Sequence, residues 1–302
     1  MLCALAFFLL WTVAAEGAEP LSVVTTSTDL KSLVEVVGGE RVRVESLALP
    51  LQDPHAVEVK PGQLTKLKAA ALLVRIGLDH EPWLDRTLRT VGDSRFTRES
   101  PHYLDTSRGI QLLQAETPRV RADKGAHIHG FGNTHYWLDP ENGRPITAAI
   151  LEALLRVAPA DRAYFEANRK RFLEQLDGRL KIWLQTMAPY KGTRVVAVHE
   201  TWPYFAQRFG LMIVAVVEPN PGVPPSPSYL ASLIQKMRDS GIKLLIADPY
   251  SNASTVSQVA TQSGATAVTL IPSVGGDPGA SDYLSLFDFN TKRLSQAARP
   301  AQ

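Results

Sequence analysis

The chain has 302 residues and a formal net charge of +2, with 45% hydrophobic and 21% charged residues. At about 150 residues per domain, this length is enough for two lobes that each bury a core. The small net charge argues against nucleic acid or an anionic membrane as a partner. The single cysteine, Cys3, lies in the first apolar run, so the rest of the chain offers neither a disulfide framework nor thiolate ligands.

The first residues are typical of an export signal. Residues 2–13 are apolar and uncharged, and small residues follow at Ala14 and Ala15. The run ends before Glu16, which makes it shorter than the roughly 20 apolar residues of a membrane-spanning helix. We therefore expect a signal peptide within residues 1–18 and a mature protein in the periplasm or another extracytoplasmic compartment.

The remaining chain is predicted to form two α/β lobes joined by one long helix. Residues 19–160 form the first lobe, 161–188 the linking helix and 189–302 the second lobe. Strands are predicted at 21–26, 42–49, 70–76, 194–198, 211–218 and 243–247, and helices at 29–37, 64–67, 82–91, 142–154, 204–209, 228–240 and 254–264. This alternation is typical of parallel sheets covered by helices on both faces. The apolar residues of the linking helix recur every three to four positions, as in an amphipathic helix.

Three of the seven histidines lie where α/β folds place ligand-binding residues. His55 follows the second predicted strand in the stiff sequence Asp53-Pro54-His55, and His199 ends the strand at 194–198. His135 begins an aromatic segment, His135-Tyr136-Trp137, after a polar loop. Taken alone, His55 is equally well explained as a surface loop residue.

The three histidines occur in linked motifs, which are Asp53-Pro54-His55-Ala56-Val57-Glu58, His135-Tyr136-Trp137-Leu138-Asp139-Pro140 and Val198-His199-Glu200-Thr201-Trp202-Pro203-Tyr204-Phe205. In this order and at this wide spacing, the chain resembles the zinc/manganese-binding family of solute-binding proteins of ABC importers. The resemblance implies that His55, His135 and His199 bind a metal ion. It also implies that the ion is cargo for an importer permease, and we expect the protein to be a monomer.

The fourth ligand is where the sequence departs from many manganese-type members of the family. Their late aspartate has no counterpart in the stretch 270–276, and Asp277 comes a few residues too late. Asp248, at the end of the strand at 243–247, is the better candidate. A water molecule is the main alternative, since an aspartate before Pro249 can also simply cap a turn.

Three further histidine sites receive other expectations. His127 and His129 form a short version of the histidine-rich loop of zinc-type members, and either collect metal weakly or have no role. His80 is expected to support the ligands or to lie on the surface, and His102 has no expected role.

Three histidines with at most one carboxylate favour zinc over manganese. A zinc-dependent hydrolase is the rival reading, because three histidines and an open position also describe a hydrolytic site. The chain lacks a His-Glu-x-x-His helix and a Gly-x-Ser-x-Gly turn, so we expect no enzyme. An adhesion or sensing module stabilised by its metal is a second alternative.

Overall fold

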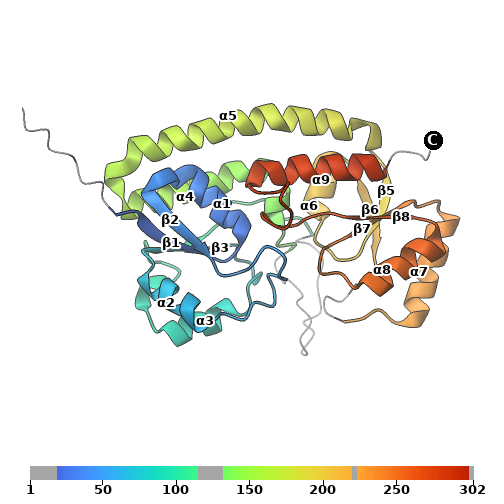
Figure 1. Cartoon of the computed structure of the whole chain (residues 1–302), viewed down its shortest axis with the longest axis horizontal. Coiled ribbons are helices and arrows are strands. Elements are labelled where there is room, and N and C mark those ends of the chain that lie inside the picture. The colour runs from blue at the N-terminus through green and yellow to red at the C-terminus, as the bar shows by residue number, and fades with distance from the viewer. Residues whose placement is uncertain (1–18, 115–131, 220–222, 299–302) are drawn as a thin grey trace, which may run out of the picture.

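The protein consists of two α/β lobes that lie side by side beneath one long helix, α5 (Arg162–Met187), as Figure 1 shows. The computed structural model describes residues 19–114, 132–219 and 223–298. The predicted fold class is therefore confirmed. Within the described ranges, no helix is both long enough and apolar enough to cross a bilayer.

The first lobe is built on a parallel sheet with the strand order β2-β1-β3-β4. Its strands are β1 (Leu21–Thr25), β2 (Val42–Ser46), β3 (Leu72–Arg75) and β4 (Tyr103–Asp105), and its helices are α1 (Thr28–Gly38), α2 (Pro61–Ala69), α3 (Leu84–Val91) and α4 (Gly143–Val157). Every residue of β3 is buried, as expected of a central strand covered on both faces. Because the strands are parallel, the loops that follow them meet at one edge of the sheet.

The second lobe repeats this topology with the order β6-β5-β7-β8. Its strands are β5 (Arg194–Ala197), β6 (Met212–Val216), β7 (Leu244–Ala247) and β8 (Thr266–Thr269), and its helices are α6 (Pro203–Phe209), α7 (Pro227–Asp239), α8 (Ala253–Ser263) and α9 (Tyr283–Ala297). The short strands β4 and β8 and the helix α9 are absent from the sequence prediction. Helix α9 packs along α5 and reaches back to α1 in the first lobe.

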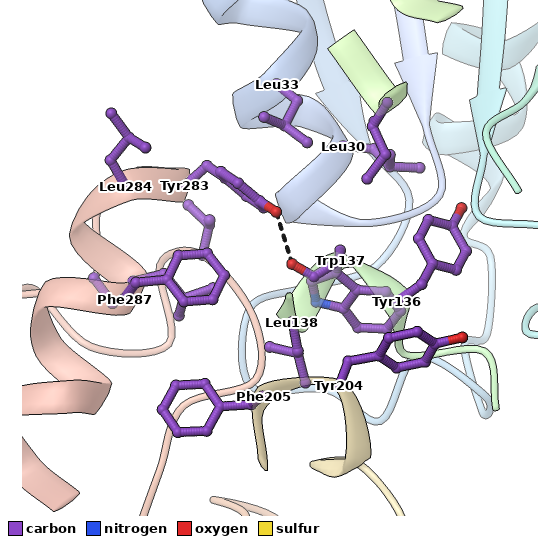
Figure 2. Close-up of a cluster of buried hydrophobic side chains, with 14 of the residues drawn as sticks. Leu30, Leu33, Tyr136, Trp137, Leu138, Tyr204, Phe205, Tyr283, Leu284 and Phe287 are labelled. Carbon is purple, nitrogen blue, oxygen red and sulfur yellow. Dashed lines mark hydrogen bonds between the residues drawn. The ribbon is translucent and has the colours of Figure 1, made fainter. Parts of the chain in front are cut away.

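An aromatic core occupies the junction of the lobes, as Figure 2 shows. It combines side chains of α1, of the short 3-10 helix Tyr136–Leu138, of α6 and of α9, labelled as Leu30, Leu33, Tyr136, Trp137, Leu138, Tyr204, Phe205, Tyr283, Leu284 and Phe287. Tyr283 donates a hydrogen bond of 2.8 Å to the carbonyl oxygen of Trp137. The Trp137 indole donates to the carbonyl oxygen of Pro272 at 2.9 Å. Truncating one such buried tryptophan costs about 3–5 kcal/mol, so the segment that follows His135 is firmly anchored.

Candidate metal centre

Three histidines of the first lobe converge at the loop edge of its sheet. His55 follows β2, His80 follows β3, and His135 precedes the 3-10 helix Tyr136–Leu138. Each side chain offers one possible ligand atom, and these three atoms all lie within 4.8 Å of one another. Among the described residues, this is the one group of histidine, cysteine, aspartate and glutamate side chains found in such an arrangement.

The ring of His55 is held by hydrogen bonds that select its tautomer. Its Nδ1 lies 2.9 Å from the carbonyl oxygen of His80, and since a carbonyl only accepts, Nδ1 carries the proton. The Asp53 side chain accepts from the His55 backbone N–H at 2.9 Å, and the Trp83 indole donates to the Pro54 carbonyl at 2.8 Å. These bonds fix the loop and make Nε2 the nitrogen of His55 whose lone pair can bind a ligand.

The ring of His135 is oriented in the same way by Asn133. The side-chain nitrogen of Asn133 donates to the carbonyl oxygen of Glu200 at 2.7 Å and to the side-chain oxygen of Gln114 at 3.2 Å. These two acceptors determine which end of the amide is oxygen. That oxygen lies 3.2 Å from Nδ1 of His135, so Nδ1 carries the proton and Nε2 carries the lone pair.

The Nε2 atoms of His55 and His135 lie 3.4 Å apart. With both Nδ1 atoms protonated, two neutral rings would present their Nε2 lone pairs to each other, an arrangement that a cation between them would stabilise. Two nitrogens bound to tetrahedral zinc at 2.0–2.1 Å are about 3.3 Å apart. The observed spacing therefore fits one metal ion bound by both imidazoles.

His80 is fully buried, so the prediction of a surface position for this residue is wrong. Its ring centre lies 4.3 Å from that of His55 and 5.2 Å from that of His135. Its Nδ1 is 2.8 Å from the Thr134 hydroxyl oxygen, and its ring meets Trp137 edge-on. The signal for its position was present in the sequence, because His80 follows a buried strand as His55 does.

The loop that carries His80 has an unusual backbone. Gly77, Leu78 and Asp79 all have positive φ, at 88°, 56° and 58°. A side chain at position 77 would clash with Asp105, which explains the glycine. Positive φ in a leucine costs of order 1–3 kcal/mol and persists only where the surroundings hold it.

Glu81 provides the restraint that holds this loop. Its carboxylate accepts hydrogen bonds from the backbone N–H groups of Ile76 and Gly77 and from the Thr26 hydroxyl. It also pairs with the buried guanidinium of Arg75 at 2.9 Å. Burial alone would lower the pKa of Arg75, but the neighbouring Glu81 carboxylate and the contact with Tyr103 keep it above its usual value, so the guanidinium stays charged.

His199 and Asp248 lie outside the group of three histidines. His199 follows β5, its Nδ1 is 3.5 Å from a carboxylate oxygen of Glu218, and its ring stacks on Tyr250. Burial lowers the pKa of His199, partly opposed by Asp53, so the ring is neutral at pH 7. The assignment of His199 as a ligand stays a prediction.

Asp248 follows β7 and is buried, and one carboxylate oxygen accepts from the Trp202 indole at 2.9 Å. Burial raises its pKa to about 8, which means that the metal-free side chain holds a proton at neutral pH. Its role as the fourth ligand, with water as the alternative, also stays a prediction. His102 binds the Ala71 carbonyl instead, and His127 and His129 lie outside the described residues.

Comparison with known proteins identifies the family. The family model described as zinc-uptake complex component A, periplasmic, matches residues 23–297. The chain is 24% identical over 300 residues to the manganese ABC transporter substrate-binding lipoprotein PsaA of Streptococcus pneumoniae, covering 94% of this chain and 91% of the relative. It is 23% identical over 266 residues to the high-affinity zinc uptake system protein ZnuA of Yersinia pestis, covering 83% of this chain and 82% of the relative.

The fold agrees with that assignment. A crystal structure of ZnuA matches with a TM-score of 0.76 at 24% identity, covering 92% of this chain and 99% of the other. The resemblance seen in the histidine motifs is thus confirmed over almost the whole chain. The chain belongs to the zinc-uptake complex component A family of periplasmic, metal-binding solute-binding proteins.

Proposed function

We propose that this protein captures a transition-metal ion outside the cytoplasm, zinc in preference to manganese, and acts as a monomer that delivers it to the permease of an ABC importer. Membership of the family supports capture and delivery. The observation that carries the proposal is the 3.4 Å separation of the Nε2 atoms of His55 and His135. In both rings the hydrogen bond at Nδ1 favours coordination through Nε2.

The preference for zinc rests on the donor atoms. Relatives are named for manganese as well as for zinc, so kinship alone does not choose. Imidazole suits zinc, copper, nickel and iron, whereas manganese favours carboxylate, carbonyl and water oxygens. A centre that begins with the imidazoles of His55 and His135 therefore favours zinc.

The proposed ligand set spans both lobes. His55 and His135 come from the first lobe and His199 from the second, with Asp248 or water completing a tetrahedron. The lowered pKa of His199 supports this role because only a neutral ring coordinates. The raised pKa of Asp248 makes the fourth position testable, since binding at Asp248 releases a proton at pH 7 and binding of neutral water does not.

Metal content and a competition titration test the proposal. We expect the protein purified from the exported fraction to contain one zinc ion, and His55→Ala and His135→Ala to lose tight binding. His102→Ala is the matched control, since the His102 ring is hydrogen-bonded to the Ala71 carbonyl oxygen. If both variants held zinc as tightly as the parent protein, the proposed site would be wrong.

A further inference from the structure

We propose that His80 is a third metal ligand from the first lobe, so that this chain holds its cargo with histidines alone: His55, His80, His135 and, from the second lobe, His199. The inference rests on the proposed function and deepens it. Zinc takes four ligands in a tetrahedron, and with His80 in the set His199 fills the last position. Asp248 is then not needed as a ligand.

The position of the ring carries the first step. A nitrogen of His80 lies within 4.8 Å of a nitrogen of both His55 and His135. Those separations need to shrink by at most about 1.5 Å to reach the roughly 3.3 Å expected around tetrahedral zinc. Side-chain adjustments of this size accompany ligand binding without backbone movement.

The hydrogen bond of His80 carries the second step. Its Nδ1 lies 2.8 Å from the Thr134 hydroxyl oxygen, which can accept the ring proton. This places Nε2 as the metal-binding nitrogen, the same choice of atom as in His55 and His135. Thr134 directly precedes His135, so the bond also ties the two ligand-bearing segments together. Metal-binding histidines commonly use their second nitrogen in this way.

The carbonyl group of His80 provides a further link, because it accepts the Nδ1–H of His55 at 2.9 Å. His80 thus orients one ligand through its backbone while its side chain faces the same centre. The rigid loop held by Glu81 keeps both groups in place. A purely structural role would be served by an apolar ring packed on Trp137, which would not put a third imidazole nitrogen beside the other two.

An all-histidine site has a consequence for selectivity. Four neutral nitrogen donors suit zinc and its neighbours in the affinity series, and offer manganese none of the oxygens it prefers. Three of the four ligands also lie on one lobe, on loops fixed by hydrogen bonds. The site is therefore largely assembled before the second lobe contributes His199.

The first test uses the unaltered protein, with its histidines labelled with ¹⁵N and loaded with ¹¹³Cd as a tetrahedral stand-in for zinc. We expect a one-bond coupling between ¹¹³Cd and Nε2 of His80, as well as of His55 and His135. Couplings to His55 and His135 without one to His80 would overturn this inference and leave the proposed function intact. Failure to bind either metal would instead remove the proposed function.

The second test is His80→Phe, which keeps a ring against Trp137 but removes the donor. X-ray absorption at the zinc edge should show one imidazole fewer than in the parent protein. Loss of a ligand's hydrogen-bonding partner typically lowers metal affinity about 10–100-fold. Removing the ligand itself should lower zinc affinity by at least as much. His102→Phe is the matched control. His80→Gln, which keeps a polar side chain, serves if the phenylalanine variant does not fold, and an unchanged imidazole count in a folded variant would refute the assignment.

Discussion

The backbone N–H of Val274 donates a hydrogen bond of 2.9 Å to a side-chain oxygen of Asp29, which lies in the first turn of α1. This bond joins the first lobe to the segment between β8 and α9. Asp29 is fully buried. Among the described residues, no lysine, arginine or histidine forms an ion pair with it. Burial raises its pKa to about 7, although the hydrogen bond from Val274 opposes the shift.

The raised pKa predicts how stability changes with pH. Because the folded-state pKa of Asp29 exceeds its unfolded value of 3.8, the folded protein binds more protons between these two values. Its unfolding free energy therefore falls as pH rises from about 4 to 7, by about 4 kcal/mol if the full shift of roughly three units is realised. Urea unfolding of metal-free protein at pH 5 and pH 8 measures the effect.

Asp29→Asn isolates the share of this residue, since the amide oxygen still accepts from Val274. The variant should lose less stability between pH 5 and pH 8 than the parent protein does. Asp282→Asn is a suitable control, because Asp282 caps α9 at the surface. An equal loss in the Asp29→Asn variant and the parent would contradict the assignment.

A second prediction concerns Asn133, which fixes the tautomer of His135. Asn133→Leu keeps the branched shape of the side chain but removes the oxygen that accepts the Nδ1 proton, together with the amide donor to Glu200 and Gln114. Zinc affinity should fall about 10–100-fold, as is typical when a ligand loses its hydrogen-bonding partner. A competition titration checks this. Asn168→Leu, in α5 away from the centre, should leave affinity unchanged, and equal affinities for all three proteins would show that Asn133 has no such role.

The third prediction is that zinc binding weakens in acid. Protonated imidazole cannot coordinate, and its reference pKa is near 6.5, so affinity should fall progressively below about pH 6. Burial lowers the pKa of His199, so this ring should remain competent at lower pH than an exposed histidine. Zinc titrations between pH 5 and pH 8 measure the profile. Undiminished affinity at pH 5 would rule out a histidine site.

The sequence was sufficient to predict both parallel sheets and the long helix, because continuous apolar strands and a 3.6-residue period are local signals. Helix α9 was missed for a physical reason. Its buried residues include polar ones, Asn290, Thr291 and Ser295, as well as apolar ones, because it packs against elements on several sides. Burial on several sides blurs the single apolar stripe on which such a prediction depends.

The candidate site was likewise predicted only in part from the sequence. His55 and His135 were found because each lies in a motif, and the structure brings their Nε2 atoms together. His80 was undervalued although its place after a strand was visible in the sequence, because its burial depends on contacts with Thr134 and Trp137, more than fifty residues away. Such long-range packing leaves little trace in a single sequence.

The last prediction is that the lobes keep their mutual orientation when metal binds. Helix α5 runs without a break from Arg162 to Met187, and a sharp bend in a helix needs an identifiable cause. Gly178 is the weak point, although one glycine costs only about 1 kcal/mol in a helix. Helix α9 braces the helix near that point: the Trp183 indole donates to Asp288 at 2.7 Å, and Arg179 forms an ion pair with the same carboxylate.

Small-angle scattering of metal-free and zinc-loaded protein decides the question, and we expect the radius of gyration to be the same in both. Gly178→Ala should then stabilise the protein by about 0.5–1 kcal/mol, because the position is open to solvent and helical. It should leave zinc affinity unchanged, since no bending at this position is required for binding. A contraction of several ångströms on zinc loading, or a loss of affinity in Gly178→Ala, would mean that α5 is a hinge rather than a rigid connection.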